Sequence, residues 1–256
     1  MTSLPEILAA ARPIDGGFAC TVPETWLQGR TAYGGLSGAL ALHAALASEP
    51  DLPPLRSAQV AFVGPLAGEV TVTATTLRRG RNAAFVQADI VGEKGLGYRA
   101  TYVFMAAIDS SAKLNETRRA GVTPPDDDVP LYTGPTPYFT SNFNFLDYKD
   151  DLATAEWKRW CRLIHRNGLH PAVEVMSVAD ALPPAAMRVM EGRAPVSSLT
   201  WIVNLLDPAP ATTGGWWLLQ AVTDYAEGGY SSQRMGIWNA DGKLVAEGMQ
   251  GGAIFG

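Results

Sequence analysis

Residues 36–46 read LSGALALHAAL, and this stretch decides how the chain folds. Ser37 and His43 are its only polar side chains, so a helix of this sequence is apolar almost all round. Such a helix is normally buried by other elements on every side. The rest of the chain must therefore supply a sheet that wraps around it.

The segments after this helix show the alternation of β-strands. In Glu69–Leu77 valine and alanine alternate with threonine, and Ala83–Val91 and Tyr98–Ala107 follow the same period of two. Residues 78–82 (RRGRN) and 93–95 (EKG) separate these runs and are typical of hairpin turns. The first half thus predicts one helix followed by long antiparallel strands.

The second half of the chain repeats this plan. An apolar helical run lies within Pro171–Met187 and is ended by Pro183 and Pro184. The strand patterns are Glu156–Leu163, Val196–Leu206, Trp216–Tyr225, Tyr230–Trp238 and Lys243–Phe255. The two hairpin turns recur at offsets of 148 and 147 residues. We predict an α+β fold of two antiparallel sheets, each wrapped around a central helix.

A connector separates the two halves. Between residues 109 and 137, Pro, Asp, Gly and Thr replace the alternating apolar residues. This composition is typical of a segment without regular structure. The predicted division is an N-terminal unit of residues 1–108, a connector of residues 109–137, and a C-terminal unit of residues 138–256.

The composition argues against several classes of protein. The 256 residues include 20 Lys and Arg against 25 Asp and Glu, a net charge of −5, which disfavours a nucleic-acid partner. Two cysteines cannot form a disulfide framework, and the three histidines lack the partners of a metal site. Neither a signal peptide nor an apolar run of about 20 residues is visible. We expect a cytoplasmic protein with no membrane partner.

Several motifs, taken in order, resemble those of a known family. In the first half they are Tyr33-Gly34-Gly35, the strand before Gly64-Pro65, and the turn Leu77–Asn82. In the second half they are Ala179–Pro184, Ser198–Thr200 and Gly248–Gly252. Over nearly the whole chain, except its ends and the connector, this series resembles the double-hotdog acyl-CoA thioesterases.

The resemblance implies a tandem hotdog fold and a hydrolase of fatty acid metabolism that cleaves the thioester of acyl-CoA. No cofactor is expected, because coenzyme A is part of the substrate. Members of the family commonly pair into dimers or larger assemblies, so a homo-oligomer is expected here as well.

The resemblance also implies catalytic residues in the second half. The family uses an Asp on the second hotdog helix, a Thr or Ser on the next strand and a Gln on the last strand. These positions correspond to Asp180, Ser198 and Gln250. Thr200 lies two residues beyond Ser198, and strand alternation places both hydroxyls on one face. Either hydroxyl is therefore a candidate.

Asp180 and Gln250 are also unusual by themselves. Asp180 interrupts an apolar helical run, where an unpaired carboxylate would be costly to bury. Gln250 alternates with apolar residues on an inward strand face, where its amide needs partners. The alternatives are a solvent-facing or capping Asp180 and a purely structural Gln250.

Two pairs of residues are candidates for substrate binding. Gly34 and Gly35 begin the first helix, whose free N–H groups would polarise a thioester carbonyl. Close packing of helix on sheet is the alternative for these glycines. Arg78 and Arg81 would contact the phosphates of coenzyme A, although an exposed, solvated turn is the simpler account of them.

The residues fit two other enzyme functions less well. No G-x-S-x-G motif surrounds Ser198, which disfavours a Ser-His-Asp hydrolase. A hotdog enoyl-CoA hydratase would need Asp or Asn five residues before a His, and none of the three histidines has one there. A non-catalytic protein that binds acyl-CoA or lipid remains open, because the same polar residues can be present without turnover.

Overall fold

The structure is a computed structural model that describes residues 2–126, 128–149, 151–192 and 194–255. In the first half the helices are α1 (Leu4–Ala9), η1 (Glu24–Trp26) and α2 (Gly34–Ala47). The strands there are β1 (Arg12–Ile14), β2 (Gly17–Val22), β3 (Leu27–Gln28), β4 (Thr31–Ala32), β5 (Leu55–Phe62), β6 (Gly68–Arg79), β7 (Ala83–Gly92) and β8 (Gly95–Met105).

The second half has the same kind of content. Its helices are η2 (Phe139–Asn142), α3 (Pro171–Ala179), η3 (Ala185–Arg188) and η4 (Thr213–Gly215). Its strands are β9 (Phe143–Asp147), β10 (Glu156–Leu163), β11 (Val196–Leu205), β12 (Trp217–Glu227), β13 (Tyr230–Asn239) and β14 (Leu244–Ile254).

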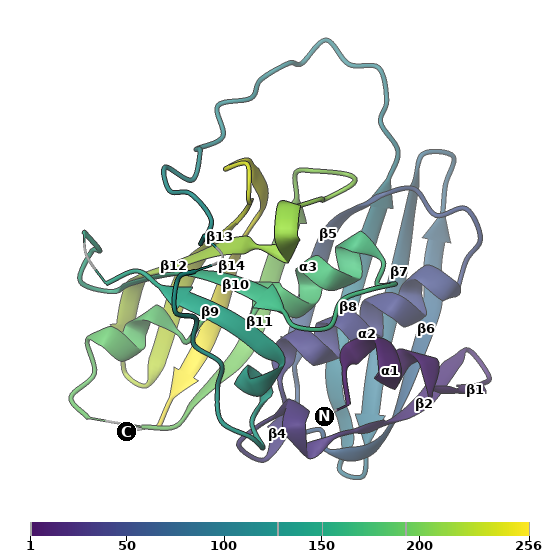
Figure 1. Ribbon diagram of the computed structural model, residues 1–256. Coiled ribbons are helices and arrows are strands. Elements are labelled where there is room, and N and C mark those ends of the chain that lie inside the picture. Colours follow the sequence, from purple (N-terminus) through teal and green to yellow (C-terminus); the bar gives the residue numbers. More distant parts are fainter. Residues whose placement is uncertain (1, 127, 150, 193, 256) are drawn as a thin grey trace.

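Both halves arrange their long strands in the same order. The first half runs β2-β6-β7-β8-β5 across the sheet, and the second half runs β10-β12-β13-β14-β11. At the centre β5 and β11 pair antiparallel, with Gln59 opposite Ile202. The two predicted sheets are therefore joined edge to edge into one sheet of 12 strands (Figure 1). The predicted α+β double-hotdog class is confirmed.

The helices α2 and α3 lie side by side on one face of this sheet (Figure 1). Along α2, Leu36, Leu40 and Leu42 are all at most 1% exposed, and the helix also packs on β6, β7 and β8. The apolar surface of this helix is thus covered on every side, as its sequence predicted. The N-terminus of α2 lies against the C-terminal end of α3, since the hydroxyl of Tyr33 donates to the carbonyl of Ser177.

The end of α3 differs from the prediction. The helix ends at Ala179, and Asp180 follows it as the C-cap with φ −95° and ψ 9°. Asp180 is therefore not inside the helix, where the apolar run had placed it. At these backbone angles the chain leaves the helix in a turn. This turn carries the Asp180 side chain towards the first half.

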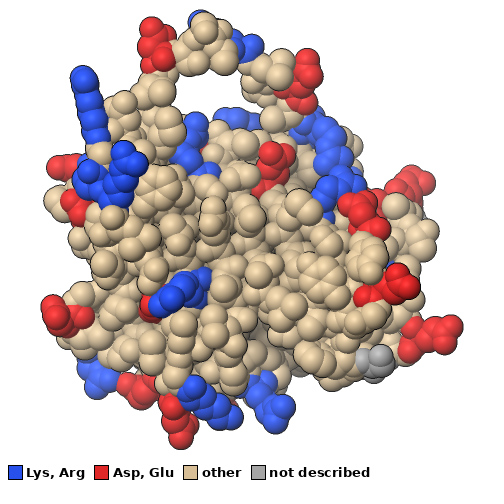
Figure 2. Space-filling model, turned by 180° about the vertical axis from the view of Figure 1, so that it is seen from behind, with Lys and Arg blue, Asp and Glu red and all other residues tan. Residues whose placement is uncertain are grey.

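The opposite face of the sheet is turned outward. Its charged side chains lie mostly towards the margin of the view from behind, and much of the middle is uncharged (Figure 2). Ile202 on β11 and Met249 on β14 are paired neighbours on this face, 48% and 54% exposed. The connector arcs away from the body between β8 and β9 (Figure 1). Among the described residues, none of the helices has the length and apolar character needed to cross a bilayer.

Candidate active site

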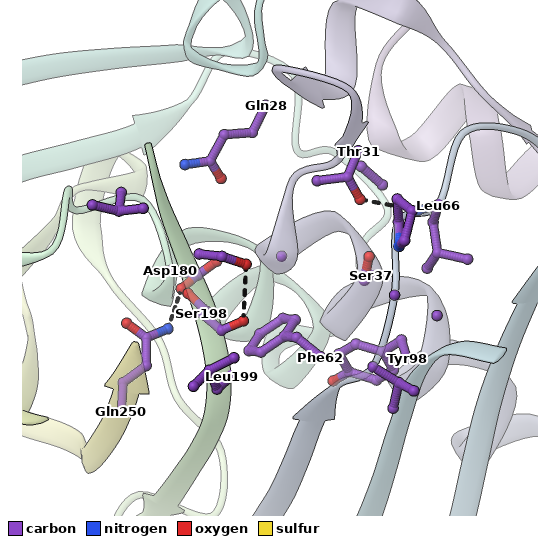
Figure 3. Close-up of a pocket in the computed structure, with 18 of the residues that line it drawn as sticks. Gln28, Thr31, Ser37, Phe62, Leu66, Tyr98, Asp180, Ser198, Leu199 and Gln250 are labelled. Atoms are coloured by element: carbon purple, nitrogen blue, oxygen red, sulfur yellow. Dashed lines mark hydrogen bonds between the residues drawn. The ribbon is translucent and has the colours of Figure 1, made fainter. Parts of the chain in front are cut away.

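A cavity of about 310 Å³ lies where the two halves meet (Figure 3). The first half supplies residues before α2, the first turn of α2, the end of β5 with the loop that follows it, and the start of β8. The second half supplies the segment after α3 and parts of β11 and β14. The lining residues are Gln28, Thr31, Ala32, Gly34, Ser37, Phe62, Val63, Gly64, Pro65, Leu66, Gly97, Tyr98, Asp180, Leu182, Pro184, Val196, Ser197, Ser198, Leu199 and Gln250.

Asp180 is the one carboxylate among these lining residues. Its Oδ1 atom accepts a hydrogen bond of 2.7 Å from Gln250 Nε2. Burial raises the pKa of Asp180 to about 7, while the bonds from Gln250 and from the backbone N–H of Gly35 oppose this rise. A carboxyl group with a pKa near neutrality can both take up and release a proton under physiological conditions.

The N-terminus of α2 lies directly against Asp180. A Cβ atom added at Gly34 would overlap with Asp180 Oδ2 and with the ring of Phe62. Tyr33, the N-cap of α2, donates from its hydroxyl to the carbonyl of Ser177 in α3 at 2.9 Å. Glycine at this position therefore permits the close approach of helix and carboxylate, and the N-terminal end of a helix favours negative charge.

Gln250 is held from its other side by Gln233 on β13. Gln233 Nε2 donates to Gln250 Oε1 at 2.7 Å, and Gln233 Oε1 accepts from the backbone N–H of Ala185 at 2.9 Å. Gln233 and Gln250 are 4% and 5% exposed. The inward position predicted for Gln250 is confirmed, and its amide has the partners that burial requires.

The two candidate hydroxyls lie on different faces of β11. Ser198 pairs with Gly252 and Thr200 pairs with Gly251, so Leu199 forms a bulge without a partner in β14. The bulge shifts the alternation by one residue. Ser198 consequently lines the cavity beside Asp180 (Figure 3), whereas Thr200 is exposed on the outer face with Ile202. The prediction that both share a face is wrong for this reason.

Comparisons with known proteins agree with this geometry. A family model described as the acyl-CoA thioesterase N-terminal domain matches residues 22–106, and one described as the C-terminal domain matches residues 117–254. The chain belongs to the acyl-CoA thioesterase family. The expected enzyme class, a thioester hydrolase that acts on acyl-CoA, is thereby confirmed.

Solved structures of similar fold cover almost the whole thioesterase chain. A hot dog fold protein from Alicyclobacillus acidocaldarius is 20% identical with a TM-score of 0.84, covering 100% of this chain and 99% of its own. An acyl-CoA thioesterase II from Mycobacterium marinum is 16% identical with a TM-score of 0.78, covering 98% of each chain. A tesB protein of Mycobacterium avium is 17% identical with a TM-score of 0.79, covering 98% of this chain and 99% of its own. At such identities the likeness concerns the fold. Among curated proteins, none matches the chain significantly.

The two predicted arginines do not lie at the cavity of this thioesterase. Arg78 pairs with Phe85 at the hairpin end of β6, and Phe85 in turn pairs with Val103 near the end of β8. The cavity is lined by Gly97 and Tyr98 near the start of β8. Arg78 and Arg81 are exposed in the described structure and absent from the cavity wall. Their predicted role in substrate binding therefore has no support from the cavity itself.

Sequence reasoning missed other residues of the site. Gln233 supports Gln250, while Phe62 and Tyr98 form an aromatic wall with their ring centroids 5.6 Å apart. The alternation in Tyr230–Trp238 places Gln233 on one face with Ser231 and Met235, which was the available signal for its burial. Within the described residues, no group of three or more His, Cys, Asp and Glu side chains is placed to hold a metal ion.

Proposed function

We propose that Asp180 is the general base with which this thioesterase hydrolyses acyl-CoA. The observation that supports the proposal most directly is the position of its carboxyl group. The group faces a cavity, accepts from Gln250, lies against the N-terminus of α2, and has a pKa raised by burial to about 7.

The proposed reaction has two steps. The Asp180 carboxylate takes a proton from water while the water oxygen forms a bond to the thioester carbonyl carbon. The tetrahedral intermediate then expels the thiolate of coenzyme A, which receives the proton from Asp180, and the carboxylic acid product remains. Ser198, on the same wall of the cavity, would orient the water through its hydroxyl.

A backbone N–H group of α2 would stabilise the oxyanion. The first turn of a helix has N–H groups without intrahelical partners. Tyr33 N–H already donates to the Trp26 carbonyl at 2.9 Å, and Gly35 N–H is used by Asp180. Gly34, which lines the cavity, therefore supplies the N–H that we assign to the oxyanion. Direct attack by Asp180, through an anhydride, would use the same position of the carboxyl group and is the alternative mechanism.

The cavity wall suits an uncharged acyl group. Phe62, Leu66, Leu182 and Leu199 provide apolar surface, and the described lining contains no Lys or Arg. The apolar residues on the outer face of the sheet, including Ile202 and Met249, are compatible with the expected homo-oligomer. The assembly and the cytoplasmic location stay predictions.

Thiol release from a panel of acyl-CoA substrates tests the proposal. Asp180→Asn should lower kcat by about 10²–10⁴-fold, the usual contribution of a general base. Asp224→Asn is the matched control, because Asp224 is an exposed carboxylate that pairs with Arg234 on β13. It should leave kcat unchanged.

Full activity in Asp180→Asn would remove Asp180 from the mechanism. Thermal stabilisation of the native protein by acyl-CoA without any thiol release would instead favour the binding-only alternative. Turnover that depends on Asp180 would exclude that alternative.

A further inference from the structure

A ring of hydrogen bonds runs from the segment after α3 through two strands and back to Asp180. Ala185 N–H donates to Gln233 Oε1, Gln233 Nε2 donates to Gln250 Oε1, and Gln250 Nε2 donates to Asp180 Oδ1, at 2.9, 2.7 and 2.7 Å. The first donor, Ala185, and the last acceptor, Asp180, lie on the same short segment, so the backbone between them closes the ring. The ring therefore ties residues 180–185 to β13 and β14.

The direction of each bond in the ring follows from its first donor. A backbone N–H can only donate, so Gln233 must turn its amide oxygen to Ala185 and its NH2 group to Gln250. Gln250 must then accept with its oxygen, which leaves its own NH2 group facing Asp180. With Gln250 reversed, two NH2 groups would face each other, and an amide oxygen would face the carboxylate.

Burial makes this orientation strict. Gln233 is 4% exposed and absent from the cavity lining, so water cannot replace a partner that its amide loses. A buried amide without its partner loses the full benefit of its hydrogen bond and also bears the cost of desolvation. A donated N–H favours the ionised form of a carboxyl group, whereas a facing amide oxygen favours the protonated form.

We infer that Gln233 is a positioning residue that fixes the amide of Gln250 so that its NH2 group faces Asp180 and favours the carboxylate. Gln233 is absent from the cavity lining, so it acts only through Gln250. The inference rests on the proposed role of Asp180 as the base.

The other side chains around Asp180 do not replace Gln233 and Gln250 in favouring its ionised carboxyl group. Tyr33 beside α2 and Tyr98 on β8 face Asp180, and burial raises the pKa of both phenols well above its usual value, so both stay neutral. Arg159 on β10 is bonded to the carboxylate of Asp147 at 2.6 Å and to the carbonyl of Ala181 at 3.3 Å. Ser198 on β11 and Phe62 on β5 carry no charge.

The first measurement is the pH profile of kcat/KM in Gln233→Met, which keeps the size of the side chain and removes its amide. Activity of the wild type should rise with pH through about 7, as Asp180 ionises. In the variant the midpoint should rise by about one pH unit, so that kcat/KM falls about tenfold at pH 6 and stays within about twofold at pH 9. Gln59→Met, on the outer face of β5, should leave the profile unchanged.

The second measurement is stability against pH, which reports the Asp180 pKa without turnover. Between about pH 4, where Asp ionises in an unfolded chain, and pH 7, the unfolded chain loses this proton while the folded chain keeps it. Wild type should therefore lose stability relative to Asp180→Asn as the pH rises, until the folded pKa is passed. In Gln233→Met, compared with its own Asp180→Asn counterpart, the loss should continue to higher pH.

The two measurements separate the inference from the proposed function. Shifted midpoints in both support the positioning role of Gln233. A shift in stability without a shift in the rate profile would keep this role and overturn Asp180 as the base. Unshifted stability, or an equal loss of rate at every pH, would overturn the inference, because a merely structural residue behaves in that way.

Discussion

The helices α2 and α3 occupy equivalent places in the two halves, yet their N-termini differ. α3 begins at Pro171, which has no N–H, and His170 Nδ1 accepts from the N–H of Ala172 at 3.2 Å. This N-terminus is therefore capped by its own segment. α2 begins at Gly34 after Tyr33, and no side chain of its own segment caps it. The carboxyl group of Asp180 caps this N-terminus instead, by accepting from the N–H of Gly35.

The positions that face these two N-termini also correspond. His43 lies nine residues beyond the first residue of α2, and Asp180 lies nine residues beyond the first residue of α3. His43 is close enough to His170 that burial and this neighbour lower its pKa. The repeat thus produces two equivalent junctions, and only one combines an uncapped helix N-terminus with a carboxylate. Divergence of a duplicated fold left one junction structural and made the other a candidate active site.

Among the changes that test this difference between the two junctions, Gly34→Ala is expected to have the largest effect on the rate. The added methyl group would displace Asp180 and Phe62, and misplacement of a catalytic group by about 1 Å can cost about 10²-fold in rate. Gly38→Ala is the control on the same helix, because its nearest new neighbour is the flexible Met176 Cε at 3.3 Å.

Thiol release and thermal unfolding measure both variants. Gly38→Ala should keep its rate within about twofold and gain about 0.5–1 kcal/mol of stability, because alanine favours a helix. Equal activity in Gly34→Ala and Gly38→Ala would show that the close approach at α2 is unimportant for catalysis.

A smaller effect is expected at the bulge in β11. Ser198→Ala removes the hydroxyl that lines the cavity and should lower kcat by about fivefold, since one neutral hydrogen bond is worth about 1 kcal/mol. Thr200→Ser, which keeps the hydroxyl, and Thr200→Ala should both stay within about twofold, because Thr200 lies on the outer face. The kcat of each variant, measured at steady state with one acyl-CoA substrate, tests this ranking. The opposite ranking would mean that the bulge rearranges when substrate binds.

The smallest effect is expected from the hairpin arginines of the first half. Arg78→Gln with Arg81→Gln should change KM for acyl-CoA by less than about twofold at low salt, because neither side chain lines the cavity. A several-fold rise in KM that disappears at high salt would restore the predicted contact with the phosphates of coenzyme A.

Much of the fold was predictable because strand and helix patterns are local. The predicted bounds of β10, Glu156–Leu163, agree with the structure, and the hairpins of both halves lie where their turns indicated. Short elements such as β9 (Phe143–Asp147) were missed, since five residues hold too little alternation to stand out. The end of α3 was placed too late, because Ala181 and Leu182 continue the apolar pattern after the helix has stopped at Ala179.

Two similar units that each bury a helix could be predicted from the chain alone, because periodicity along the chain decides which face of an element is apolar. The sequence also marked Asp180 and Gln250 as polar residues in apolar surroundings. That Ser198 rather than Thr200 faces the cavity follows from the folded sheet, because the bulge depends on pairing with β14. Only the structure joined α2 to Asp180, through contacts such as the Tyr33–Ser177 bond between residues 144 apart. Such contacts follow from packing between the halves, which no pattern within one half contains.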